Sequence, residues 1–165
     1  MEFDFETLLL KQKELDANIH QNHGVNYETT KSRRLLAYLV ELGELANATK
    51  TFKFWSLKPS ESRERLLDEY ADGLHFILSL VLAYDYELPI FSLSDEGDDD
   101  TLTDKFTHCY QSIVKFSETP SSSQLFQAFS DFLALGQALS FTSQDIFNAY
   151  ENKLMINYQR QNSKY

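Results

Sequence analysis

The stretch "LVELGELANATK", residues Leu39–Lys50, decides the fold because it combines the composition of a helix with two acidic residues in its middle. Its leucines and alanines can supply an apolar face, while Glu41 and Glu44 stand three positions apart. Positions i and i+3 lie on the same face of a helix, so the two carboxylates point in the same direction. Gly43 between them has no side chain and would let a neighbouring helix approach closely.

Helical spacing of apolar residues continues on both sides of this stretch. The chain has only five Gly and three Pro, and no segment alternates cleanly between apolar and polar residues as a strand would. We therefore predict an all-α fold, a bundle of about six helices. The predicted helices span about Phe5–Gln21, Thr30–Lys50, Ser60–Tyr86, Thr101–Glu118, Ser121–Leu139 and Thr142–Gln161.

Length and charge limit the classes of protein to which the chain can belong. Its 165 residues predict a single domain, 1–165, and a hydrophobic fraction of 42% is ample for one core. The net charge of −10 argues against binding a nucleic-acid polymer, because phosphate backbones require a basic surface. It does not argue against a single nucleotide, whose phosphates can be carried by metal ions.

The lone Cys109 cannot form an internal disulfide, which suits a reducing compartment. The first residues, "MEFDFETLLLKQKELD", lack the basic segment of a signal peptide, and no 18-residue apolar stretch could span a membrane. We therefore expect a cytoplasmic protein without a membrane segment.

A second acidic pair, Glu69 and Asp72, repeats the spacing of the first within "LLDEYADGLHF" (66–76). On antiparallel helices the two pairs would face a shared space, where four carboxylates repel one another unless a cation offsets them. Oxygen ligands favour a hard ion such as Mg²⁺ or Mn²⁺. The alternative is two solvated stripes, and the apolar residues flanking both pairs argue against it.

Two other metal sites fit the sequence less well. A di-iron bundle expects Glu-x-x-His on two helices, and only Asp72-x-x-His75 comes near it, so His75 is expected to be a hydrogen-bonded core or ligand-supporting group. His20, His23 and His108 have no ligand-like spacing and are expected in loops or on the surface. The run "DEGDDD" (95–100) lacks the order of a calcium loop and is expected to be solvated.

The C-terminal helix carries Lys153, Asn157 and Arg160 at positions i, i+4 and i+7, which form one polar stripe. Such a stripe could receive phosphate oxygens, or it could be a frayed polar tail. Trp55 could offer an aromatic platform or belong to the core. The many phenylalanines of the last three predicted helices fit a homodimer interface as well as a core.

Three separate segments resemble the dimeric, all-α dUTPase family, part of the wider all-α nucleotide pyrophosphohydrolase group that includes MazG-like proteins. They are "ELGELANATKTFKFWS" (41–56), "DEYADGLHFILSL" (68–80) and "NYQRQNSKY" (157–165). The resemblance implies a four-helix catalytic core. It also implies that one site holds Mg²⁺, with Mn²⁺ as a substitute, through Glu41, Glu44, Glu69 and Asp72, and that Glu41 also deprotonates the attacking water.

The resemblance assigns the C-terminal residues to phosphate binding and closure over the substrate. They are Lys153, Asn157, Arg160 and Tyr165. The family pattern has a glycine where this chain has Lys164.

The resemblance also implies a base and sugar site. Gln12 matches the family's glutamine, and Asp16 or Asn18 stands near the position of its asparagine. Trp55 would lie near the base and Phe76 near the deoxyribose.

The implied function is a Mg²⁺-dependent dUTP diphosphatase that also cleaves dUDP, assembled as a homodimer. One alternative keeps the chemistry and changes the substrate, as in a MazG-like or dCTP-directed pyrophosphohydrolase. The other is a non-catalytic helical module that binds a protein partner.

Overall fold

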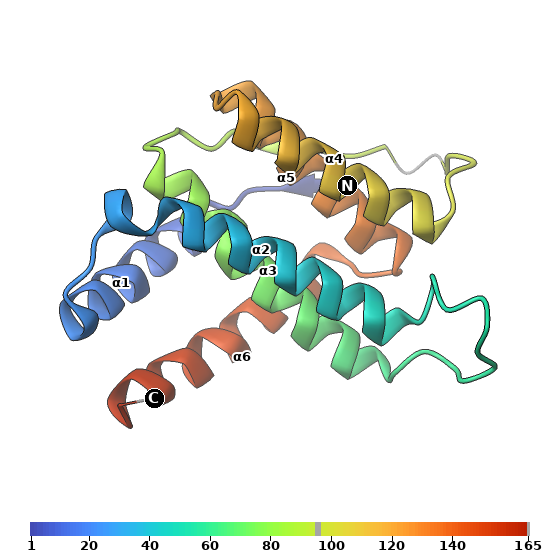
Figure 1. Cartoon of the computed structure of the whole chain (residues 1–165), viewed down its shortest axis with the longest axis horizontal. Coiled ribbons are helices and arrows are strands. Elements are labelled where there is room, and N and C mark those ends of the chain that lie inside the picture. Colours follow the sequence, from blue (N-terminus) through green and yellow to red (C-terminus); the bar gives the residue numbers. More distant parts are fainter. Residues whose placement is uncertain (95–96, 165) are drawn as a thin grey trace.

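The structure is a computed structural model that describes residues 1–94 and 97–164, and it is a helical bundle (Figure 1). The prediction of an all-α fold is confirmed. The described residues form six helices, α1 (Glu6–His23), α2 (Tyr27–Thr49), α3 (Arg63–Ala83), α4 (Leu102–Glu118), α5 (Ser122–Ala138) and α6 (Ser143–Asn162). No helix in this part of the chain is both long and apolar enough to cross a lipid bilayer.

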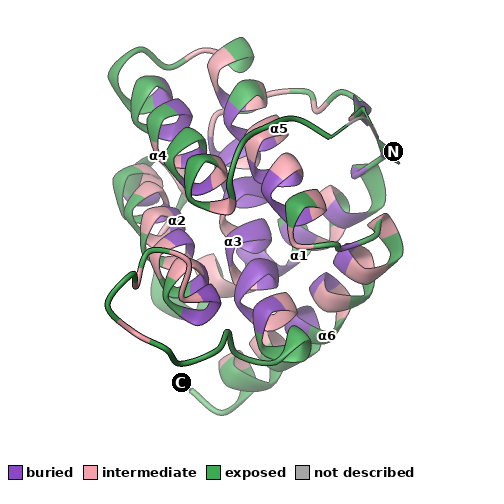
Figure 2. Cartoon of the chain, turned by 90° about the vertical axis from the view of Figure 1, so that its right-hand side faces the viewer, coloured by how far each residue is buried: buried purple, intermediate pink, exposed green. Residues whose placement is uncertain are grey.

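Helix α3 is the centre of the bundle. It packs lengthwise against α2 and also contacts α1, α5 and α6 (Figure 1). Helices α4 and α5 pair with each other, and α4 also touches α2. The buried faces of the surrounding helices turn toward α3 (Figure 2). Helices α1, α2, α3 and α6 therefore enclose one side of the molecule, where the candidate site lies.

Most phenylalanines of the last three helices fill the chain's own core. Phe106, Phe116, Phe129 and Phe132 are buried, and Phe141 is buried in the connection before α6. The ring of Phe132 stacks on that of Tyr70 with centroids 4.2 Å apart. A Cβ atom at Gly136 would lie 2.6 Å from the Tyr70 hydroxyl, so glycine is needed where α5 meets this ring.

Two predicted helix starts are wrong. Helix α2 begins at Tyr27, three residues earlier than Thr30, because Asn26 and Thr29 form a capping box. The Asn26 side chain accepts from the Thr29 backbone N–H, and the Thr29 hydroxyl accepts from the Asn26 backbone N–H. Helix α3 begins at Arg63, capped by Ser62. The start lies at Arg63 rather than near Ser60 because the cap is formed by Ser62, whose Oγ accepts from the Arg65 backbone N–H at 3.2 Å.

The sequence gives no sign of a small antiparallel ladder, β1 (Glu2–Phe3) with β2 (Phe91–Ser92), in which Phe3 pairs with Phe91. Two residues per strand are too few for an alternating pattern to appear. The ladder ties the N-terminus to the segment after α3, which itself ends at Ala83 rather than at Tyr86.

Candidate active site

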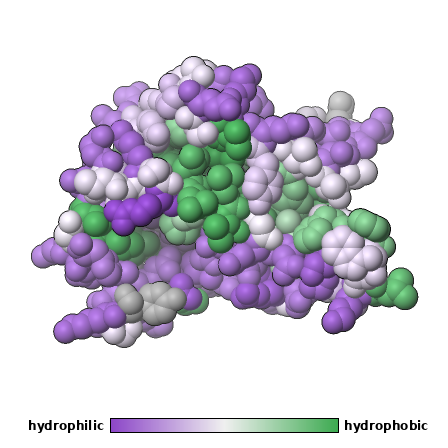
Figure 3. Space-filling model, viewed as in Figure 1, coloured by the Kyte–Doolittle hydropathy of each residue, from purple (hydrophilic) through white to green (hydrophobic). Residues whose placement is uncertain are grey.

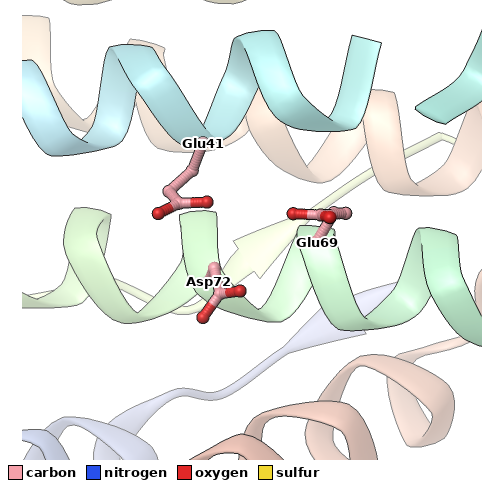
Figure 4. Close-up of side chains that lie close together, drawn as sticks. All are labelled: Glu41, Glu69 and Asp72. Atoms are coloured by element: carbon pink, nitrogen blue, oxygen red, sulfur yellow. The ribbon is translucent and has the colours of Figure 1, made fainter. Parts of the chain in front are cut away.

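Three of the four predicted carboxylates meet between α2 and α3. Glu41 of α2 points toward Glu69 and Asp72 of α3, and one oxygen of each lies within 4.8 Å of the others (Figure 4). Glu44, one turn along α2, is more exposed, and its charge contributes to the raised pKa of Glu41. The shared space predicted from the two acidic pairs therefore exists.

Burial and mutual repulsion make this cluster costly to ionise. Burial, and then the charges of Asp72, Glu44 and Glu69, raise the pKa of Glu41 to about 8. The Glu41 Oε2 atom is buried and has no hydrogen-bond partner among the described residues. Burial also raises the pKa of Glu69 and of Asp72. Because an unpaired buried carboxylate oxygen faces two further carboxylates, these side chains fit a hard divalent cation bound by oxygen ligands.

Two basic side chains border the cluster. Lys153 of α6 is buried, and its Nζ lies 2.8 Å from Asp72 Oδ2 and 2.6 Å from Asp68 Oδ1. Burial lowers the pKa of Lys153, but its hydrogen bonds to the two aspartates outweigh this and leave the pKa raised. Arg65 of α3 forms ion pairs with Glu69 and, at 3.1 Å, with Asp68. Sequence reasoning missed Arg65 and Asp68, because an isolated charge on a helix usually marks a solvated face.

A cavity of about 860 Å³ extends from this cluster and is lined by residues of α1, α2, α3 and α6. Its volume lies within the range of small-molecule sites. Of the other residues predicted for the site, Gln12, Asp16, Phe76, Asn157 and Arg160 line it together with the acids and Lys153. The cavity therefore gathers side chains that are far apart in the sequence and were predicted separately.

A buried polar network forms the wall of the cavity away from the acids. Asp16 Oδ1 accepts from Gln12 Nε2 at 3.0 Å, and Asp16 Oδ2 accepts from the Tyr27 hydroxyl at 3.0 Å. His75 lies 2.7 Å from Gln12 Oε1 and stacks on Tyr150, as expected for a hydrogen-bonded core histidine.

The expectation for another histidine needs correction. His20 is not in a loop, because it lies on α1 with its Nε2 2.6 Å from Arg34 Nη2. No sequence signal pointed to Arg34 itself, which lines the cavity from α2.

Trp55 and Asn18, both considered for the base site, do not line the cavity within this chain. Trp55 lies in the loop after α2 with 65% of its surface exposed, so the alternative that it belongs to the core is wrong, and it does not line the cavity. Tyr165 lies outside the described residues. Lys164, where the family pattern has glycine, has φ of 57°, a left-handed conformation that favours glycine. Asn18 does not line the cavity, and its side chain accepts from Asn22.

The cavity of this all-α bundle is acidic at one end and lined by amide and guanidinium groups at the other. Such a cavity is typical of one class of protein, the helical nucleotide hydrolases. A family model described as dUTPase matches residues 4–165, and the chain belongs to this family. It is accordingly a dUTP diphosphatase, a hydrolase of nucleotide metabolism. A comparison with curated proteins finds no match.

Proposed function

We propose that the chain hydrolyses dUTP to dUMP and pyrophosphate, and dUDP to dUMP and phosphate, in a Mg²⁺-dependent reaction. One observation carries the proposal: three carboxylates from two helices converge at the end of a nucleotide-sized cavity, and the buried Glu41 Oε2 has no partner among the described residues. A purely structural cluster of this kind would only cost stability.

Glu41, Glu44, Glu69 and Asp72 would hold Mg²⁺, with Mn²⁺ as a substitute. When bound, the ion neutralises phosphate charge and lowers the pKa of water. The chemistry of the donor set supports this choice, because every candidate ligand atom is a carboxylate oxygen.

Glu41 is proposed to act as the general base. Its Oε2 accepts a proton from the attacking water while the water oxygen forms a bond to phosphorus at the α–β anhydride. The bond from that phosphorus to the bridging oxygen breaks, and pyrophosphate leaves from dUTP or phosphate from dUDP. The position of the Glu41 Oε2 atom supports this role, because this buried oxygen has no hydrogen-bond partner among the described residues and can accept a proton.

Phosphate binding is assigned to Lys153, Asn157, Arg160 and Tyr165. The first three support the proposal by their spacing on one face of α6 and by lining the cavity. Their positive charges and amide donors would bind phosphate oxygens and stabilise charge in the transition state. Gln12, Asp16 and Phe76 form the base and sugar end.

A homodimer is part of the proposal. Apolar side chains gather over α2 and α4 and on the loop after α2 (Figure 3). The exposed ones on these elements are Leu36, Val40, Phe52, Phe54, Trp55, Leu57 and Val114. A second copy is the proposed occupant of this face, because Trp55 does not reach the cavity of its own chain and could reach that of a partner.

A panel of the four deoxynucleoside triphosphates and dUTP, each with Mg²⁺ and with EDTA, tests the proposal. We expect pyrophosphate release from dUTP with Mg²⁺ and little from dCTP, which separates this function from the dCTP-directed alternative. Equal rates with EDTA would contradict the proposed role of the metal.

A further inference from the structure

A second polar cluster lies in the cavity on the side opposite the carboxylates. Asp16 of α1, Arg34 of α2 and Ser79 of α3 are all buried, and all three line the cavity. Arg34 stands seven positions before Glu41 on α2, and Ser79 stands seven positions after Asp72 on α3. Two helical turns correspond to about 10 Å. A nucleoside can bridge this separation, so a nucleotide with its phosphates at the acids has its base near Arg34.

The carboxylate of Asp16 is fully used by the protein. Its Oδ1 accepts from Gln12 Nε2 at 3.0 Å and lies 3.4 Å from Arg34 Nη1. Its Oδ2 accepts from the Tyr27 hydroxyl at 3.0 Å and from the Ser79 hydroxyl at 2.8 Å. A carboxylate offers about four lone-pair sites, and all are taken. Asp16 is therefore suited to hold its neighbours in place rather than to contact a ligand.

Arg34 is held from three sides but keeps one donor. Its Nε donates to Thr30 Oγ1 at 2.8 Å, its Nη1 contacts Ser79 Oγ and Asp16, and its Nη2 lies 2.6 Å from His20 Nε2. The Nη2 atom carries two N–H groups, and the contact with His20 uses one of them, so one N–H of Nη2 has no partner among the described residues. Because arginine has no acceptor, this remaining N–H on the cavity wall can bind only an acceptor atom.

We propose that Arg34, positioned by Asp16, donates a hydrogen bond to the exocyclic O4 of uracil and so discriminates uracil from cytosine. This inference rests on the proposed function. Cytosine carries an amino group in place of O4, so two donors would face each other and both would lose their hydrogen bonds. A buried site built to bond one such group rejects the analogue that lacks it.

A purely structural role is the competing explanation, because the Arg34–Asp16 ion pair also ties α2 to α1. The two roles differ in what they do to substrate choice. Loss of a structural tie would weaken activity toward all nucleotides alike, whereas loss of the base contact would lower activity toward dUTP more than toward dCTP.

Steady-state kinetics with dUTP and dCTP, both with Mg²⁺, test the proposal on Arg34→Met and Arg34→Lys. We expect the ratio of kcat/KM for dUTP over dCTP to fall about tenfold or more in Arg34→Met, mainly through the KM for dUTP. Lysine should restore part of the ratio because it is a donor. Lys31→Met, on the same helix but paired with Glu28 outside the cavity, should leave the ratio unchanged.

Equal losses for both nucleotides in Arg34→Met would overturn the inference and leave the proposed function standing. If Arg34→Met does not fold, Asp16→Asn replaces it, because this substitution keeps the shape of the side chain and removes the charge that holds Arg34. It should also lower the ratio of kcat/KM for dUTP over dCTP. An unchanged ratio would overturn the inference. A wild-type protein that does not cleave dUTP would contradict the proposed function itself. Calorimetric affinities for dUMP and dCMP need no turnover and would still test the base contact.

Discussion

The carboxylates of Glu41 and Asp72 face each other from two different helices, with an oxygen of each within 4.8 Å of the other. Burial raises the pKa of both groups, and the charge of Asp72 raises the pKa of Glu41 further. Two like charges at the α2–α3 contact weaken the fold unless a cation lies between them. The protein thus holds together groups that it would be more stable without, which is typical of functional sites.

Glu41→Gln should therefore raise thermal stability in the absence of divalent metal while reducing hydrolysis by a factor of about a hundred or more. The amide carries no charge for its neighbours to repel. A gain of about 1 kcal/mol corresponds to roughly 2–4 °C in a chain of this size. Scanning calorimetry in EDTA measures it, with the exposed Glu87→Gln as a control that should not change. A lower Tm for Glu41→Gln would refute the account of charge repulsion.

The acidic site could be predicted from the sequence because its signal is local. Glu41 and Glu44 share a helix face by spacing alone, and the apolar residues around them indicate partial burial. Gly43 likewise behaves as expected, since a Cβ atom there would lie 3.2 Å from the Tyr110 hydroxyl of α4, which donates to the Leu39 carbonyl. Spacing alone could not identify the basic side chains that pair with the acids of this site.

Arg34 has no local signal, because its contacts with Asp16 and Ser79 arise only when α1, α2 and α3 pack together. Arg65 does stand three and four positions before Asp68 and Glu69, but such spacing is also common on solvated helix faces. The ends of helices were hard to predict for a related reason. Ser60 and Ser62 are equally good caps by composition, and only the structure shows that Ser62 forms the cap. Counting phenylalanines likewise could not tell the chain's own core from an interface.

Lys153→Met should lower both stability and activity. The Lys153 ammonium is buried and pairs with Asp68 and Asp72, so its loss removes the cation that is hydrogen-bonded to Asp72 and leaves Asp68 paired with Arg65, at a cost of about 1.5–3 kcal/mol. Lys11→Met removes the more exposed pair with Glu151 and should cost less than about 1 kcal/mol. Urea unfolding measures both. Equal costs would show that Lys153 is an ordinary surface cation.

Stability should fall with acid in a way that depends on His75. Burial lowers the pKa of His75 to about 3, although the hydrogen bond to the Tyr150 carbonyl opposes this. The unfolded chain, with an ordinary histidine pKa near 6.5, binds the proton first, so stability is lost as pH falls below about 6.5. The loss between pH 7.5 and 5 is on the order of 2 kcal/mol.

This loss should be smaller in His75→Gln, and the control His108→Gln, exposed on α4, should keep the wild-type slope. Urea unfolding at a series of pH values gives the slopes. If the free energy of unfolding of His75→Gln depends on pH as steeply as that of the wild type, then His75 is not a buried neutral group.

Val40→Glu should shift the protein toward monomers if the apolar face over α2 and α4 is the proposed homodimer interface. The side chain of Val40 is 48% exposed, so the substitution should leave the fold of one chain intact. Light scattering at micromolar concentration measures the mass. The exposed Met155 on α6 gives the matched control, Met155→Glu, which should not change it. A monomeric wild-type protein would contradict the interface.

The central claim, that the carboxylate cluster holds the metal that dUTP hydrolysis requires, is tested most directly by one measurement. It is the rate of dUMP and pyrophosphate release from dUTP as Mg²⁺ is titrated into metal-free wild-type protein and into Glu69→Gln. We predict no release without Mg²⁺, saturation in the wild type, and a much higher Mg²⁺ requirement or no activity in Glu69→Gln. Release in EDTA, or the same Mg²⁺ dependence in both proteins, would contradict the claim.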